Sequence, residues 1–263
     1  MILIWDTCAL NGVCRAIAHH ITHTAAPGTA PMRQAEFLQR LEGIMAGLHA
    51  RCKYTSHTTE VVFAIEVDPA TADSKLRNQD DLVECFCADE TFVEAWQSVL
   101  ENRIATEPVH EVEIEALRRI VQPDPGQRDL SLIVAALKLS SQSGQNCVIA
   151  TDDISLTERI NELRRIRREV FMDGMQYSTT RLTGKLSLEV LRELYLSCGL
   201  DHDFWTSALF SFKLHNNGNY GQAGQKHLQH VVAFFGQFNS DRAEKEHGCS
   251  VAELGPIFGV NNA

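Results

Sequence analysis

The residues best suited to chemistry are acidic side chains that end apolar segments or begin predicted helices. They are Asp6, Glu60, Asp129, Asp152 and Asp153. Crowded carboxylates repel one another at neutral pH unless a cation compensates their charge. Oxygen ligands without an accompanying His/Cys set select Mg²⁺ or Mn²⁺ over Zn²⁺. Because such an ion can activate water and neutralise a phosphodiester, the pattern indicates metal-dependent phosphodiester hydrolysis.

These acids can meet only if the chain forms a suitable sheet. Short apolar runs alternate with helical patterns, which predicts an α/β fold with a parallel sheet. Strands are expected at 2–5, 52–55, 147–150 and 169–172, and helices at 34–48, 60–66, 80–100, 109–121, 129–142 and 156–168. A polar turn is expected at 56–59, and a loop or irregular helix at 15–33. Ligands of such sheets bind beyond the carboxyl ends of the strands, where strand order reverses.

The second part of the chain has a different character. After about residue 176 no comparable strand pattern is present, and helices are expected at 187–197 and 225–238. We therefore expect an α/β domain at 1–175 and a mostly helical C-terminal extension at 176–263.

Composition restricts the remaining function classes. The 263 residues carry a net charge of −10, which argues against a protein that simply coats DNA but is compatible with a carboxylate-rich nuclease. No apolar run approaches the roughly 20 residues that span a bilayer, and no signal peptide is evident. The eight cysteines are scattered, so reduced thiols and a cytoplasmic location are expected.

Four segments in order resemble the PIN-domain ribonucleases. They are Ile-Leu-Ile-Trp-Asp6-Thr7, Tyr-Thr-Ser-His-Thr-Thr-Glu60, Arg-Asp129-Leu-Ser-Leu-Ile-Val, and Val-Ile-Ala-Thr151-Asp152-Asp153. The resemblance covers about residues 1–175 and implies a three-layer α/β/α nuclease domain with a central parallel sheet. It also implies a Mg²⁺- or Mn²⁺-dependent endoribonuclease acting on RNA. Many family members are toxins paired with an antitoxin, others process RNA, and many are dimeric, so an antitoxin or other protein partner and a homodimer enter as expectations.

The resemblance also implies roles for individual residues. Asp6, Glu60, Asp129 and Asp153 would form the acidic quartet, since the family's last motif usually reads Thr-x-Asp. Asp152 would then occupy the variable position, Thr151 would hydrogen-bond the site, and Thr7 would be a polar neighbour of Asp6. The long stretch between Glu60 and Asp129 and the C-terminal extension depart from the small toxins of the family.

Several alternatives remain open at this stage. Each acid taken alone fits an ordinary turn or helix start. The densest basic run comprises Arg164, Arg165, Arg167 and Arg168. These residues could contact RNA phosphates beside the site, or they could form a solvated helix face paired with acids. His19, His20 and His23 suggest a surface loop more than a metal site.

The domain as a whole could be a catalytically inactive module that binds a protein. A haloacid dehalogenase-type phosphatase would need Asp-x-Asp, whereas this chain has Asp6-Thr7-Cys8.

Overall fold

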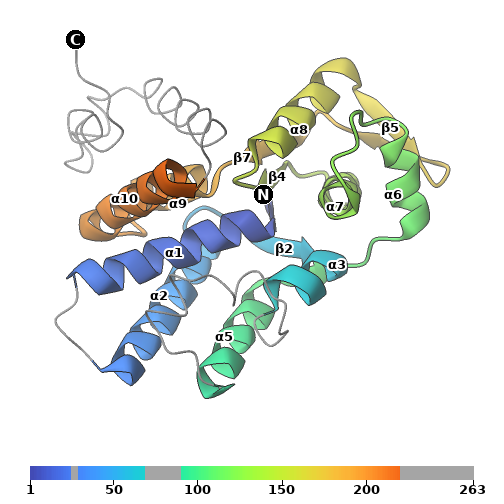
Figure 1. The fold of residues 1–263 in the computed structure, drawn as a ribbon. Helices are drawn as coiled ribbons and strands as arrows, with labels where there is room; N and C mark the ends of the chain where they lie inside the picture. Colours follow the sequence, from blue (N-terminus) through green and yellow to red (C-terminus); the bar gives the residue numbers. More distant parts are fainter. Residues whose placement is uncertain (25–28, 69–89, 220–263) are drawn as a thin grey trace, which may run out of the picture.

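The structure is a computed structural model that describes residues 1–24, 29–68 and 90–219. Within these residues five strands form one parallel sheet in the order β3-β2-β1-β4-β7. The strands are β1 (Ile2–Trp5), β2 (Thr55–Thr59), β3 (Ala105–Glu107), β4 (Cys147–Ala150) and β7 (Leu182–Lys185). Helices flank the sheet, an arrangement compatible with three α/β/α layers (Figure 1).

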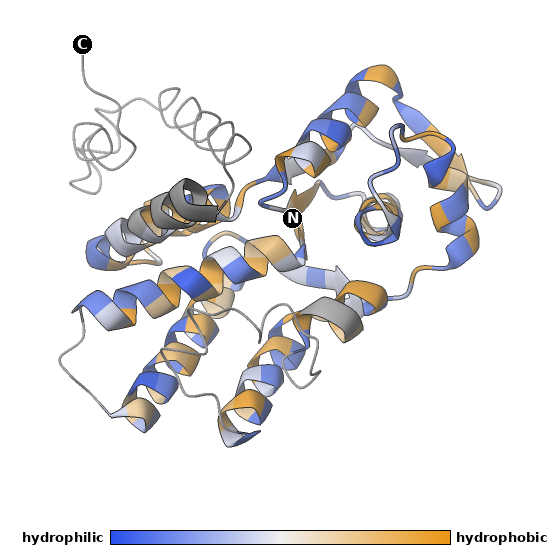
Figure 2. Ribbon diagram, viewed as in Figure 1, coloured by the Kyte–Doolittle hydropathy of each residue, from blue (hydrophilic) through white to orange (hydrophobic). Residues whose placement is uncertain are grey.

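The helices follow the strands along the chain. They are α1 (Thr7–Thr24), α2 (Ala30–Ala50), α3 (Glu60–Val62) with a π-helical turn at Phe63–Val67, α5 (Glu90–Arg103), α6 (Glu111–Arg118), α7 (Gln127–Ser143), α8 (Ile154–Ile166), α9 (Ser187–Leu196) and α10 (His202–Asn219). Hydrophobic and hydrophilic residues alternate around α2 and α5, as expected for helices with one buried side (Figure 2). No helix in the described part of the chain is long and apolar enough to cross a membrane.

The strongest local predictions are confirmed. All four residues of β1 and of β4 are buried, as their continuous apolar sequences predicted. The predicted helix at 129–142 is α7, which ends at Gly144 in the left-handed conformation with φ 69°. The predicted helix at 34–48 is α2, which buries Phe37 and Leu41 along one side.

The strand prediction was wrong for β2. The structure assigns the strand to Thr55–Thr59, where a polar turn was expected. Its polar side chains are satisfied by neighbouring strands: Thr58 Oγ1 donates to the Trp5 carbonyl at 2.9 Å, and His57 Nδ1 lies 2.8 Å from Glu107 Oε1. Pairing with β1 and β3, which is a long-range interaction, therefore outweighs the local turn preference.

The prediction of no further strand after residue 176 was also wrong. β7 pairs in parallel with β4 and forms one edge of the sheet. β5 (Glu169–Met172), expected as the last strand, pairs instead with β6 (Met175–Ser178) in a separate antiparallel hairpin. The expected boundary near residue 175 falls within this hairpin. The described part of the expected extension thus includes a strand of the central sheet, and the helix expected at 225–238 lies outside the described residues.

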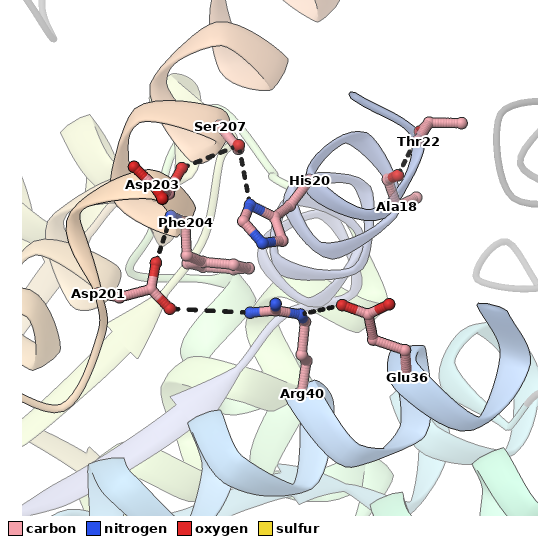
Figure 3. Close-up of polar contacts among 9 residues, drawn as sticks. All are labelled: Ala18, His20, Thr22, Glu36, Arg40, Asp201, Asp203, Phe204 and Ser207. Atoms are coloured by element: carbon pink, nitrogen blue, oxygen red, sulfur yellow. Dashed lines mark hydrogen bonds and ion pairs between the residues drawn. The ribbon is translucent and has the colours of Figure 1, made fainter. Parts of the chain in front are cut away.

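Helix α10 packs along α1, so two segments far apart in sequence form one side of the molecule (Figure 1). The expected loop at 15–33 is largely the regular helix α1. His20 in this helix is 4% exposed, and its Nδ1 lies 3.0 Å from Ser207 Oγ of α10. Figure 3 shows the ring pointing between α10 and Arg40 of α2. His20 is therefore an interior packing residue rather than part of a surface loop.

Candidate functional site

The candidate site lies at the carboxyl end of the central strand. The chain runs from β1 to β2 and β3 on one side and then returns to add β4 and β7 on the other side of β1. Strand order therefore reverses between β1 and β4, which is where ligands of open parallel sheets bind. Asp6 directly follows β1, and Thr151 directly follows β4.

Asp6 is buried and held by hydrogen bonds. The residue is 8% exposed. Thr151 Oγ1 donates to Asp6 Oδ2 at 2.6 Å, and Cys8 Sγ donates to the same oxygen at 2.8 Å. Burial raises the pKa of Asp6, the charge of Asp152 raises it further, and hydrogen bonds from Cys8, Thr151 and the Thr7 backbone lower it. Asp6 is thus a fixed carboxylate whose charge is costly unless a positive group compensates it.

Cys8 connects the ends of the two strands and was missed by sequence reasoning. Its thiol lies 3.2 Å from Thr151 Oγ1 and accepts a hydrogen bond from the Asp152 backbone N–H at 2.9 Å. Burial, together with the charges of Asp6 and Asp152, raises the pKa of the thiol well above its usual range. The thiol therefore stays protonated and acts as a hydrogen-bond donor rather than a nucleophile. Its position two residues after Asp6 was the only sequence signal.

Asp152 links the end of β4 to the start of α9. Its Oδ1 accepts from the Ser187 backbone N–H at 2.8 Å, and its Oδ2 accepts from Ser187 Oγ at 2.7 Å. Burial raises the pKa of Asp152, while the Ser187 hydrogen bonds and the charge of Arg15 lower it. Gly12 of α1 makes room for this contact, because a Cβ there would lie 2.6 Å from Asp152 Oδ2. Neither Ser187 nor Gly12 was identified from the sequence.

Asp153 has a different role from its neighbour. It is exposed, and its Oδ1 accepts from the backbone N–H groups of Ser155 at 2.7 Å and Leu156 at 3.4 Å, which caps α8. Its own N–H donates to Thr151 Oγ1 at 3.1 Å. Of the two adjacent acids, the structure therefore assigns the capping role to Asp153 and brings Asp152 into electrostatic contact with Asp6.

Glu60 and Asp129 lie on elements that meet at the same edge of the sheet. The hydroxyl oxygens of Thr59, at the end of β2, and of Ser131, in the first turns of α7, lie 3.0 Å apart in the interior and form a hydrogen bond. Glu60 follows Thr59 and is exposed, whereas Asp129 lies in the first turn of α7 and is half-buried. The structure thus places the predicted acids on elements that end or begin at one edge of the sheet, where Asp6 is buried and Asp152 is half-buried.

The predicted arginines lie at the other end of α8. Arg164 and Arg165 occupy the last turn of the helix, Arg167 and Arg168 follow it, and all four are exposed. Asp153 begins the same helix, so Arg164 lies roughly 16 Å away along the axis at 1.5 Å per residue. Of the two alternatives left open by the sequence, this position favours the solvated helix face over contacts beside the acidic site.

No metal site is preformed in the described ranges: no three His, Cys, Asp or Glu side chains there are grouped so that they could hold an ion. Comparisons with family models, curated proteins and solved structures found no match for this chain.

Proposed function

We propose that this protein is a Mg²⁺- or Mn²⁺-dependent endoribonuclease of the PIN type. The observation that carries the proposal is the environment of Asp6. A buried carboxylate with a raised pKa ends the central strand at the reversal of strand order, beside a second carboxylate, Asp152. The charge of a buried carboxylate is normally neutralised by a positively charged partner. A divalent cation is the partner that would compensate this pair.

The residues are compatible with Mg²⁺ despite the missing three-ligand group. Mg²⁺ keeps several waters and commonly takes only one or two protein carboxylates, together with substrate phosphates. Asp6 would be the direct ligand, and Glu60, Asp129, Asp152 and Asp153 would act directly or through water. When bound, the ion would supply an activated water and would neutralise charge on the scissile phosphodiester.

The remaining features of the site favour an anionic substrate. Helix α1 begins just after β1, and α7, which has no side-chain cap at Gly126, begins near the contact of Ser131 with Thr59. Helix N-termini carry unsatisfied N–H groups and a partial positive charge, which attract phosphate. Thr151 and Cys8 donate to one oxygen of Asp6 and so fix the orientation of its carboxylate.

Cleavage of RNA by the full chain tests this proposal. We expect cleavage of single-stranded RNA with Mg²⁺ or Mn²⁺ and none with EDTA. Asp6→Asn should reduce cleavage to background, because the amide lacks the negative charge that compensates a divalent cation. Asp173→Asn is the matched control, since Asp173 is exposed in the β5–β6 turn, away from the sheet edge. An Asp6→Asn protein that cuts as fast as the parent would overturn the assignment.

A second candidate function, a catalytically inactive module that binds a protein, is favoured by exposed apolar side chains. Phe171 and Met175 of the hairpin are 64% and 59% exposed, and Ile166 at the end of α8 is 60% exposed. Such side chains are typical of contact surfaces when they occur together. Calorimetry with Mn²⁺ separates the two functions: no binding at millimolar metal, together with no RNA cleavage, would favour the interaction module.

A further inference from the structure

A small pocket lies between α8 and the loop that connects α6 to α7. Its volume is about 90 Å³. Val121 and Gln122 line it from the loop, and Arg159, Glu162, Leu163 and Arg167 line it from α8 and its C-cap. We refer to it as the Arg159 pocket. It is distinct from the Asp6 site, because none of the predicted acidic residues lines it.

The guanidinium of Arg159 is incompletely satisfied. Its Nη1 is buried, and among the described residues it has no hydrogen-bond partner. A buried N–H without an acceptor costs free energy, more so when the group is charged. An oxygen-rich anion in the pocket would supply the missing acceptor.

The chemistry of the lining selects the kind of anion. Arg159 and Arg167 contribute two positive charges against one negative charge from Glu162, in a chain whose net charge is −10. Apolar side chains of Val121 and Leu163 limit water on one side, which strengthens interactions between charges. The planar guanidinium group presents parallel N–H donors that match the oxygens of a phosphate.

We propose that the Arg159 pocket binds a phosphate group. The phosphate belongs either to the RNA backbone or to a small free phosphate. Arg159 lies six positions after Asp153 in α8, or roughly 9 Å along the helix axis. The loop on the other side of the pocket leads into α7, whose first turn contains Asp129. The pocket therefore lies on the path from the acidic edge towards the exposed arginines at the end of α8.

Calorimetric titration of the metal-free full chain with inorganic phosphate tests the pocket itself. The ionic strength is held constant. We expect one saturable site. Arg159→Gln should weaken binding at least about tenfold, because it removes the charge and the paired donors. Arg165→Gln is the control: it removes one exposed charge from the same helix outside the pocket, and we expect less than about a twofold effect. Both variants should unfold at a temperature near that of the parent. No saturable binding, or equal weakening by the two variants, would overturn the proposal.

Binding of single-stranded RNA distinguishes the two sources of phosphate. This arm rests on the proposed ribonuclease function and is measured without divalent metal, so that no cleavage occurs. If the RNA backbone occupies the pocket, Arg159→Gln should weaken RNA binding, reduce the salt dependence by about one counterion, and remove competition by inorganic phosphate. If phosphate binds but RNA affinity is unchanged, the pocket takes a free phosphate. Loss of cleavage by Asp6→Asn with unchanged phosphate binding separates this site from the catalytic one.

Discussion

Gly12 provides the most direct test of the contact that joins β4 to α9. A Cβ at Gly12 would lie 2.6 Å from Asp152 Oδ2 and 2.6 Å from Ser187 Oγ, closer than nonbonded atoms approach. Both atoms belong to a hydrogen-bonded pair, so neither can move without loss of that pair. Gly12→Ala should therefore separate Asp152 from Ser187.

The size of the effect follows from two opposing terms. Alanine in the interior of a helix is favoured over glycine by about 1 kcal/mol. Each hydrogen bond to a carboxylate contributes about 1.5–3 kcal/mol. Loss of both bonds to Ser187 gives a net destabilisation of about 2–5 kcal/mol, and we expect the lower half because Asp152 is partly exposed. The melting temperature should then fall by at least about 4 °C.

Gly43→Ala is the matched control for this measurement. Gly43 lies in the interior of α2, is exposed, and would have no atom within 4 Å of an added Cβ. It should stabilise the protein by up to about 1 kcal/mol. Urea and thermal unfolding of the two variants measure the contrast. If Gly12→Ala were as stable as Gly43→Ala, the close packing of α1 against Asp152 would be refuted.

Two further predictions concern pH. Burial raises the pKa of Asp6, so the folded protein loses stability as pH rises through that pKa. In EDTA, Asp6→Asn should therefore be more stable than the parent at pH 8. The difference between their urea midpoints should shrink towards pH 4. Burial, aided by the charge of Arg40, lowers the pKa of His20 despite the opposing charges of Asp201 and Glu36 (Figure 3). Its contribution is complete above the unfolded value of about 6.5 and is lost as pH falls through the folded pKa. The parent should therefore lose more stability than His20→Gln between pH 7.5 and pH 5, and equal losses would contradict this explanation.

Elements with strong local patterns were predictable. The apolar runs of β1 and β4 and the apolar stripe of α7 identify buried elements before any tertiary contact is known. The Asp173-Gly174 pair is also a local hairpin signal: both residues have positive φ, 48° and 73°, and they join β5 to β6.

Elements stabilised by distant partners were not predictable. β2 is polar along most of its length and becomes a strand because β1 and β3 satisfy its backbone. β7 is only four residues long and contains Gly184, yet it completes the sheet by pairing with β4. Neither sequence has the hydrophobic pattern that usually identifies a strand.

The positions of the acids after β1 and β4 and in the first turns of α3 and α7 can be read from the amino-acid order, because they depend on local patterns of burial and capping. The role of each acid depends instead on long-range contacts. Asp152 is held by Ser187, 35 positions away, whereas the adjacent Asp153 caps its own helix. Cys8 reaches Thr151 only because β1 and β4 are neighbours in the sheet. The carboxylates are chemically alike in sequence, and their surroundings, which come from distant parts of the chain, set their charge and their hydrogen bonds.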